Sequence, residues 1–302
     1  MKSSFRMAQA IVAFSLVIVA PQGHASPSPA DAILIEEHPQ ESHQHGCQLI
    51  RKTLSIVDPV RGSPARVIFD HYTPEAGDQL ANVIILPPTG GENTLDRLYA
   101  RDFCNRGLGA LLVKTWTYDT ESSLDFSTHD NGYRRAVHAV EAIMKFVPGR
   151  IGILGTSLGS LYASVLLASE PRIESAVLIV SGAPLWTILA KSQMGPVKAQ
   201  REQRMKNLGI ASVDAYEAQM KKVIHFDVTR FLPLSREKKV FMVNALKDKF
   251  VASQTQQALW RALGRPAKVD INAGHLGTVF RAYLWHHQKI EDFLVQNLED
   301  RP

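Results

Sequence analysis

The sequence has little of several features that mark specialised proteins. It contains only two cysteines among 302 residues, which excludes a disulfide-dense miniprotein. Its basic excess is small, with 34 basic and 29 acidic residues, and no basic run is interleaved with aromatic side chains. Nucleic-acid binding is therefore not expected. The sequence has no internal repeat, which excludes a repeat architecture.

What is present is an ordinary globular composition. Apolar residues make up 45% of the chain and charged residues 21%. This composition excludes a disordered chain, collagen and a coiled coil. The length is sufficient for one large α/β domain or two smaller ones, and the chain can bury a sizeable core.

The first 25 residues have the pattern of a secretory signal peptide. Lys2 and Arg6 give a positive start, a mostly apolar run follows over residues 8–20, and small residues precede a cleavage point after Ala25. A run of 13 residues is too short for a bilayer core, which requires about 20. We expect cleavage before Ser26, no membrane span in the mature chain, and a periplasmic or secreted protein.

Residues 26–46 are rich in Pro, Ser, His and Glu, so we expect a flexible leader there. His43, His45 and Cys47 have a spacing that metal ligands can have, but this segment gives no reason to expect a fixed geometry, and no metal site is assigned. In an oxidising compartment Cys47 and Cys104 can form one disulfide. Two buried thiols are the alternative, and the sequence leaves this open because it does not place the two Cα atoms.

From residue 49 onward, strands alternate with helices. Two antiparallel strands are expected at 49–57 and 65–72, before a series of buried strands. The buried strands are expected at 83–86, 108–113, 151–154, 176–180, 239–245 and 267–271, with helices at 94–105, 130–147, 158–168, 253–263 and 279–298. This alternation predicts βαβ units and a mostly parallel central sheet flanked by helices, in one domain over residues 47–302.

A long segment interrupts this alternation. Nearly 60 residues separate the strands ending at Val180 and starting at Lys239, which is too many for a single crossover helix. We expect a small helical cap at about residues 184–233 over one end of the sheet, with a crossover packed at the side as the alternative. The basic run 198–206 suits an outer, solvated face. Four large side chains are candidates for an acyl pocket or for the core of the cap itself: Trp186, Leu189, Met194 and Met220.

Residues 155–159 read Gly-Thr-Ser-Leu-Gly and match the pattern G-x-S-x-G. The pattern alone is weak, but here it follows a predicted strand and opens a predicted helix, which is the setting of a nucleophile elbow. A serine hydroxyl requires a base, and the base requires an orienting group. Asp248 and His275 each follow a later strand, at the edge of the sheet where Ser157 is expected.

The order Ser157, Asp248, His275, with the elbow around the serine, resembles the α/β-hydrolase superfamily over roughly residues 49–298. Secreted esterases, dienelactone-hydrolase-like proteins and serine peptidases of this fold are equally similar at this level. The resemblance implies that Ser157 is the nucleophile, His275 the general base and then acid, and Asp248 its orienting carboxylate.

The resemblance also implies an oxyanion hole made of two backbone N–H groups. One is that of Leu158, and the other comes from the loop after residue 86. Proline has no N–H, so within Pro-Pro-Thr-Gly-Gly the first choice is Thr89 and the second is Gly90.

These features together indicate an exported hydrolase that cleaves a small-molecule ester through an acyl-enzyme, without a cofactor, because water completes the second step. A serine peptidase of the same fold and a catalytically silent binding protein are the alternatives. The complete set of three residues argues against the silent protein. A peptidase usually needs a carboxylate pair near the cap, and the cap sequence has no adjacent pair. Substrate, acyl length and oligomeric state are left open.

Overall fold

The computed structural model of the chain describes residues 32–39, 46–75, 81–114, 125–234 and 237–299. The expected signal peptide lies outside these residues, as do His43 and His45. Within them the chain forms nine strands. They are β1 (Ile33–Pro39), β2 (Cys47–Val57), β3 (Pro64–Pro74), β4 (Ala81–Leu86), β5 (Gly109–Val113), β6 (Arg150–Thr156), β7 (Ile173–Ile179), β8 (Lys239–Ala245) and β9 (Ala267–Ile271).

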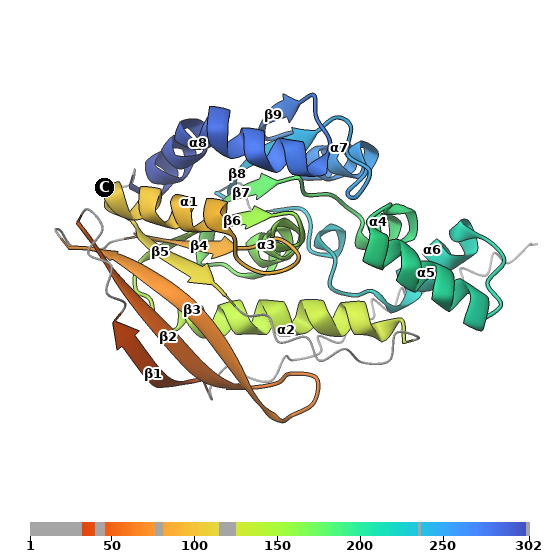
Figure 1. The fold of residues 1–302 in the computed structure, drawn as a ribbon, viewed down its shortest axis with the longest axis horizontal. Coiled ribbons are helices and arrows are strands. Elements are labelled where there is room, and N and C mark those ends of the chain that lie inside the picture. Colours follow the sequence, from red (N-terminus) through yellow and green to blue (C-terminus); the bar gives the residue numbers. More distant parts are fainter. Residues whose placement is uncertain (1–31, 40–45, 76–80, 115–124, 235–236, 300–302) are drawn as a thin grey trace, which may run out of the picture.

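The strands form a single sheet in the order β1-β2-β3-β5-β4-β6-β7-β8-β9 (Figure 1). The first four strands in this order, β1, β2, β3 and β5, pair with one another antiparallel. Every later pairing, from β5-β4 to β8-β9, is parallel. The central strands β4 and β5 are buried along their whole length. This agrees with their continuously apolar sequences, because a parallel strand is covered on both faces. The predicted mostly parallel sheet is confirmed.

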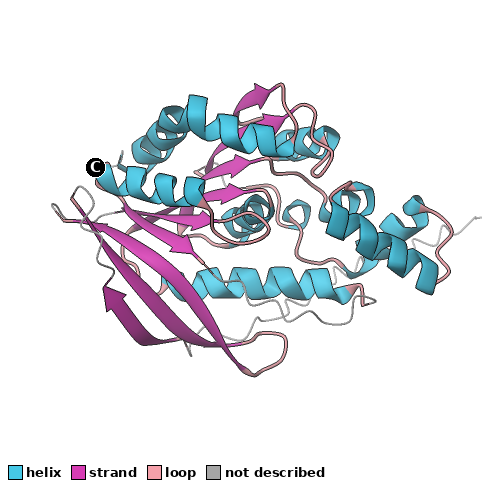
Figure 2. Cartoon of the chain, viewed as in Figure 1, coloured by secondary structure: helices cyan, strands magenta, loops and turns pink. Residues whose placement is uncertain are grey.

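Helices cover both faces of this sheet (Figure 2). One buried cluster contains side chains of α1 and α8, and the other contains side chains of α2, α3 and α7, so these two sets pack on opposite faces. The helices are α1 (Thr94–Asn105), α2 (Ser127–Met144), α3 (Leu158–Ser169), α4 (Leu185–Lys191), α5 (Gly195–Asn207), α6 (Val213–Val223), α7 (Ser253–Ala262) and α8 (His275–Glu299).

The segment between β7 and β8 is helical, as the sequence predicts. It contains α4, α5, α6 and a short 3₁₀ turn at Val228–Arg230. In Figure 1 these helices project from one end of the sheet, beyond the carboxyl ends of the parallel strands. This is the place where the sequence analysis expected a helical cap.

The expectation of a flexible leader over residues 26–46 is wrong in part. Residues 33–39 form β1, which pairs antiparallel with β2 and extends the sheet by one strand. The sequence did not suggest this strand, because Ile-Leu-Ile is followed at once by two glutamates, a histidine and a proline. An edge strand tolerates such residues, since one of its sides faces water.

Cys47 and Cys104 are joined by a disulfide, with their Cα atoms 6.2 Å apart. The bridge connects the start of β2 to the last turn of α1. Because Cys47 is in this bridge, it is not available to the His43–His45 segment as a metal ligand. Among the helices that the structure describes, none is both long and apolar enough to cross a membrane.

Candidate active site

Ser157 lies on a strained turn between β6 and α3. Its backbone angles are φ 54° and ψ −117°, a conformation that non-glycine residues rarely adopt. The two flanking glycines make the turn possible. A Cβ on Gly155 would lie 2.5 Å from the carbonyl oxygen of Gly159, and a Cβ on Gly159 would lie 2.1 Å from that of Leu86. The turn therefore accepts no side chain at either glycine.

The structure brings Ser157 together with the other two residues singled out from the sequence. Nε2 of His275 lies 2.8 Å from Oγ of Ser157, and Nδ1 of His275 lies 2.7 Å from Oδ2 of Asp248. Ser157 follows β6, Asp248 follows β8, and His275 follows β9 and opens α8. The three strands are parallel, so their carboxyl ends carry these residues to one edge of the sheet.

Asp248 is held by several donors besides His275. Its side chain is fully buried, and Oδ1 accepts the backbone N–H groups of Phe250 and Val251 at 2.7 and 3.1 Å. Oδ2 accepts the side-chain amide of Gln256 at 3.1 Å. These bonds satisfy a buried carboxylate, which would otherwise be costly in this position. Gln256 is a site residue that the sequence analysis missed.

The other acids near the site have separate partners. Asp270 lies on β9, where its carboxylate pairs with Lys268 at 2.6 Å. Asp227 lies in the segment between β7 and β8, where its Oδ2 accepts the backbone N–H of Leu185 at 2.5 Å. Asp248 is thus the carboxylate that contacts His275.

The loop after β4 approaches the start of α3. Gly91 N–H donates to the carbonyl of Pro88 at 3.2 Å, which makes Thr89 and Gly90 the central residues of a turn, and Gly90 has φ +100°. Thr89 and Leu158 line the same cavity as Ser157, whereas Gly90 is not part of the cavity wall, although both loop residues are exposed. The geometry favours Thr89 over Gly90 as the loop donor. Leu158 is the first residue of α3, and its N–H has no acceptor within the helix.

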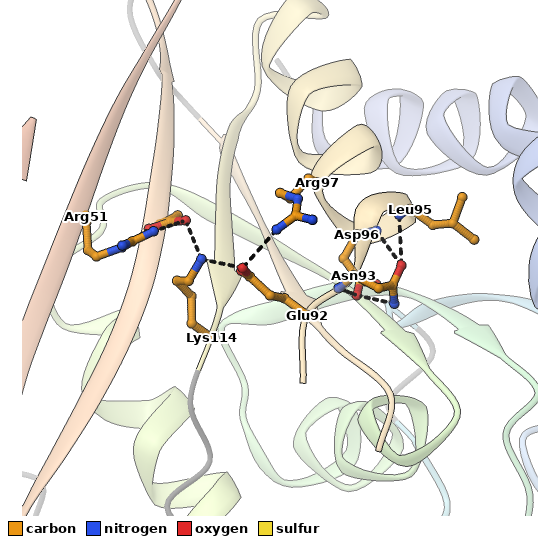
Figure 3. Close-up of polar contacts among 8 residues, drawn as sticks. Arg51, Glu92, Asn93, Leu95, Asp96, Arg97 and Lys114 are labelled. Atoms are coloured by element: carbon orange, nitrogen blue, oxygen red, sulfur yellow. Dashed lines mark hydrogen bonds and ion pairs between the residues drawn. The ribbon is translucent and has the colours of Figure 1, made fainter. Parts of the chain in front are cut away.

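Charged side chains fix this loop from the side of the sheet (Figure 3). Nζ of Lys114, just after β5, lies 2.5 Å from Oε1 of Glu92 and 3.0 Å from Oδ2 of Asp70 on β3. Arg51 on β2 pairs with Asp70 at 2.8 Å, and Arg97 on α1 pairs with Glu92 at 3.1 Å. The network thus connects β2, β3, the end of β5 and α1 to Glu92, the residue that follows Gly90-Gly91.

The N-terminus of α1 adds a second anchor to the same loop. Asn93 is the N-cap, and its side-chain oxygen accepts the N–H of Leu95 at 2.8 Å. The carboxylate of Asp96 in turn accepts the N–H of Asn93 at 3.0 Å, which completes a capping box. The loop that carries Thr89 is thus attached at its far end to a capped helix.

Ser157 opens into a cavity of about 550 Å³ between the sheet and the segment that follows β7. The wall is mostly apolar and aromatic, and its described residues include no aspartate or glutamate. Phe250 forms part of the wall and also packs against the ring of His275, with 5.2 Å between the ring centroids. The main apolar residues of the wall are Tyr133, Leu158, Leu161, Tyr162, Leu185, Ile188, Leu189, Met194, Val197 and Val251.

The four large side chains proposed either for an acyl pocket or for the core of the cap divide into two groups. Leu189 and Met194 line the cavity, as expected of pocket residues. Met220 is fully buried in the core, and Trp186 is not part of the wall; its ring instead lies 5.9 Å from Nζ of Lys221 and 5.6 Å from the guanidinium of Arg230.

The expectation of a solvated basic face over residues 198–206 is wrong in part. Arg201 and Arg204 are buried. Arg201 donates to the carbonyl of Ser192 at 2.9 Å, and Arg204 donates to that of Asp125 at 2.8 Å. A long guanidinium side chain can be buried when it finds carbonyl acceptors, which the sequence alone does not show.

The cavity wall also carries polar side chains, among them His129 from α2 and Gln200 from α5. Burial and then the nearby charge of Arg204 lower the pKa of His129 to about 4, although a hydrogen bond with Gln200 opposes the shift. The imidazole of His129 is therefore neutral at neutral pH. It gives the cavity wall a hydrogen-bonding group without a charge.

No protein-family model matches the chain, and no curated protein matches it in sequence. Solved structures do match its fold. An acetyl xylan esterase from Paenibacillus sp. R4 is 14% identical, with a TM-score of 0.61 over 84% of this chain and 89% of that one. Acetyl xylan esterase 1 from Thermoanaerobacterium sp. JW/SL YS485 is 13% identical, with a TM-score of 0.59 over 85% and 88%.

A third similar structure is a cold-adapted esterase from an Arctic intertidal metagenomic library. It is 15% identical, with a TM-score of 0.54 over 87% of this chain and 100% of that one. At such identities the likeness establishes the fold. The chain has the α/β-hydrolase fold, as its resemblance to that superfamily implied.

Proposed function

We propose that the protein is an exported serine hydrolase that cleaves carboxylic esters through an acyl-enzyme. The observation that carries this proposal is the chain of contacts from Ser157 through His275 to Asp248, which opens into a mostly apolar cavity. The esterases among the similar structures support an ester as the class of substrate. They do not identify which ester this chain cleaves.

In the first half of the reaction, Oγ of Ser157 attacks the ester carbonyl carbon while Nε2 of His275 takes the hydroxyl proton. The buried carboxylate of Asp248 stabilises the imidazolium that forms and keeps the ring in the required tautomer. The negative oxygen of the tetrahedral intermediate would bind the N–H groups of Leu158 and Thr89, and each such donor is typically worth about 10²–10³-fold in rate. His275 then gives its proton to the leaving alcohol, and the acyl group remains on Ser157.

In the second half, water repeats the attack on the acyl-enzyme. His275 takes a proton from the water, and the same two N–H groups bind the second tetrahedral intermediate. Collapse of this intermediate breaks the bond to Oγ, and His275 returns the proton to Ser157. The products are a carboxylic acid and an alcohol, and no further reactant is consumed.

The cavity favours esters over peptides. An enzyme that trims peptides from one end needs a group for the charged terminus, such as a carboxylate for an ammonium. The described residues of the cavity wall include no acidic side chain. Its one arginine, Arg135, is paired with Asp58 at 2.9 Å. An uncharged acyl chain fits such a wall, since burying it costs no unpaired charge.

Export rests on the sequence pattern of residues 1–25 and is supported by the disulfide between Cys47 and Cys104. Disulfides persist in oxidising compartments such as the periplasm and the extracellular medium. Mass spectrometry of the exported, non-reduced protein is the test. We expect a chain that begins near Ser26 and carries no free thiol; an intact N-terminus would contradict export with cleavage.

The catalytic proposal is tested with a labelled fluorophosphonate, which reacts with activated serines. We expect labelling of the wild-type protein and none of Ser157→Ala, with an unchanged melting temperature. Asp248→Asn should fold but react orders of magnitude more slowly. A Ser160→Ala variant is a matched control, because Ser160 is also buried near the elbow but its hydroxyl donates to a backbone carbonyl, that of Ser157, and not to His275. Labelling that persists in Ser157→Ala would refute the assignment.

A panel of nitrophenyl esters and aminoacyl anilides then separates the two enzymatic interpretations. We expect ester turnover that depends on Ser157 and little anilide turnover. Anilide hydrolysis that exceeds ester hydrolysis would instead identify a peptidase. Labelling of Ser157 without turnover of either class would identify a binding protein that keeps a reactive serine.

A further inference from the structure

The outer side of α8 is an exposed apolar surface. Among the described residues, five large apolar side chains are more than half exposed, and four of them lie in the first half of α8. Residues four apart lie on the same side of a helix, so Leu276, Phe280 and Leu284 form a line, and Trp285 continues the surface around the helix. We call these four residues the α8 face.

A neighbouring loop extends this surface. Leu246, which follows β8, is 46% exposed. Its N–H donates to the carbonyl of Ile271 at 3.0 Å, and the N–H of Lys247 donates to the carbonyl of Ala273 at 3.0 Å. These bonds hold the Leu246–Lys247 loop against the residues that lead into α8. In Figure 1 the helix runs along the outside of the sheet, on the side opposite α2.

The charged side chains within the α8 face and on the neighbouring loop are basic. Residues 275–290 contain no aspartate or glutamate, but they contain Arg281 and Lys289. The guanidinium of Arg281 lies 5.1 Å from the ring centroid of Trp285, within the face itself. Lys247 and Lys249 are exposed on the neighbouring loop.

The acids on the elements packed around α8 are already engaged. Asp102 on α1 accepts the hydroxyl of Tyr283 at 2.8 Å. Asp270 on β9 pairs with Lys268 at 2.6 Å, and Asp292, farther along α8, pairs with Arg106 at 2.6 Å. The α8 face is therefore an apolar surface in a basic surrounding.

We propose that the α8 face docks on the surface of an anionic phospholipid bilayer. A helix that lies in a membrane interface buries Trp, Phe and Leu on one side and places Arg and Lys near the lipid phosphates, which matches this combination. Each basic side chain near an anionic surface adds attraction that salt weakens. The contact is peripheral, and the protein needs no membrane span for it.

A second copy of the chain fits the face less well. In a two-fold contact a surface meets itself, so Arg281 and the surrounding lysines of one copy would face the same basic surface of the other. Like charges in such a contact oppose association, whereas a bilayer that contains phosphatidylglycerol supplies the opposite charge. The charge therefore selects the lipid surface over the homodimer.

The test is flotation of the mature protein with vesicles of phosphatidylcholine, with and without phosphatidylglycerol. We expect binding to the anionic vesicles that falls with salt, and much weaker binding to phosphatidylcholine alone. The double variant Phe280→Ser/Trp285→Ser should lose affinity by about tenfold or more for each side chain. Arg281→Gln should weaken binding less and reduce its dependence on salt.

Leu208→Ser is the matched control, because Leu208 is 50% exposed but lies at the end of α5, away from α8. It should bind as the wild type does. Hydrolysis of a short, water-soluble ester should be unchanged in all these variants, since none of the altered residues lines the cavity. Activity and flotation therefore report on different proposals: ester hydrolysis tests the catalytic proposal, and flotation tests the docking proposal.

Three results would overturn the docking proposal. The first is equal flotation of the wild type and of the double variant, and the second is no flotation of the wild type at low salt. The third is a dimer in sedimentation analysis that the double variant abolishes, because the α8 face would then be an interface between copies.

Discussion

Gln256 and Asp248 are joined by a hydrogen bond from the side-chain amide of Gln256 to Oδ2, the same carboxylate oxygen that contacts His275. The Gln256 side chain is fully buried and makes two further bonds. It donates to the carbonyl of Val251 at 2.7 Å and accepts the N–H of Ala245 at 2.8 Å. It therefore fixes Asp248 relative to both β8 and the loop that follows, and we regard it as a positioning residue.

Gln256→Glu tests this role with little change of shape. The new carboxyl has at most one proton to donate, so it cannot serve both Asp248 and Val251, and any negative charge it carries would lie beside the carboxylate of Asp248 and favour a positively charged imidazole. We expect kcat to fall by about tenfold, KM to stay the same, and the acid limb of the pH–rate profile to move to higher pH. Steady-state kinetics over a pH series measure all three.

Gln257→Glu is the control for this variant, because Gln257 is the neighbouring residue but contacts Lys268 at 3.4 Å instead of the site. A variant of Gln256 that melts at a lower temperature with an unchanged pH profile would show a structural role only.

Leu189 should determine which acyl groups enter the cavity, whereas Trp186 should not. Leu189→Ala removes part of the wall, so longer or branched acyl chains should gain relative to short ones by about 1–3 kcal/mol, measured as kcat/KM across nitrophenyl esters. Trp186→Ala removes a ring that contacts Lys221 and Arg230 outside the wall. It should lower stability and leave the chain-length profile intact. The opposite pattern would mean that the substrate does not occupy this cavity.

Lys114 should support catalysis at a distance through Glu92. Lys114→Met leaves Glu92 and Asp70 with one cation each, so the loop that carries Thr89 is held less firmly. We expect a several-fold lower kcat with KM little changed, because the N–H of Thr89 matters most in the tetrahedral intermediate. Lys268→Met, which also removes one paired lysine but on the edge strand β9, should leave kcat unchanged. Equal effects of the two substitutions would exclude a specific role of the network.

Glu291 should make the fold less stable as the pH rises. Burial, and then the charge of Asp102, raise the pKa of this carboxyl from 4.5 to about 7 in the folded protein. Between these values the unfolded chain has lost the proton and the folded protein keeps it, so stability falls as the pH rises through this window. Glu291→Gln removes this loss. The melting temperature of the variant should therefore exceed that of the wild type by a margin that grows from pH 5 to pH 8.

Asp292→Asn is the comparison for that measurement. Asp292 is half exposed and pairs with Arg106, so its loss should not produce a gain that grows with pH. A margin for Glu291→Gln that is constant from pH 5 to pH 8 would contradict the raised pKa.

The sequence predicted the sheet well because its buried strands are short, continuous apolar runs between turn residues. The strand at residues 239–245 is observed with those bounds. The sequence also identified Asp248 and His275 as the residues that meet at Ser157, since each of the three follows a strand of one parallel sheet. The helix expected from residue 279 begins at His275 instead, because Gly277 does not interrupt it. The catalytic roles of these residues stay predictions until the variants are measured.

The features that were missed depend on how elements pack, which no local pattern records. Gln256 reaches Asp248 only because of the way α7 lies against β8. Arg204 is buried because the cap folds back on Asp125, and Trp186 contacts Lys221 and Arg230 instead of the cavity because of the way α4 packs. Each of these contacts depends on the relative orientation of two elements, and the periodicity of apolar residues along the sequence does not determine that orientation.

The cap leaves the sheet after β7 and returns at β8, and these two strands are hydrogen-bonded neighbours. The segment between them can therefore change in length or be exchanged without altering the register of the sheet, at a small cost in loop entropy. Such an exchange would have to respect the ties to α2, where Asp130 accepts the N–H groups of His225 and Phe226. In this architecture the range of substrates can evolve almost independently of the chemistry, by grafting one contiguous stretch of the gene.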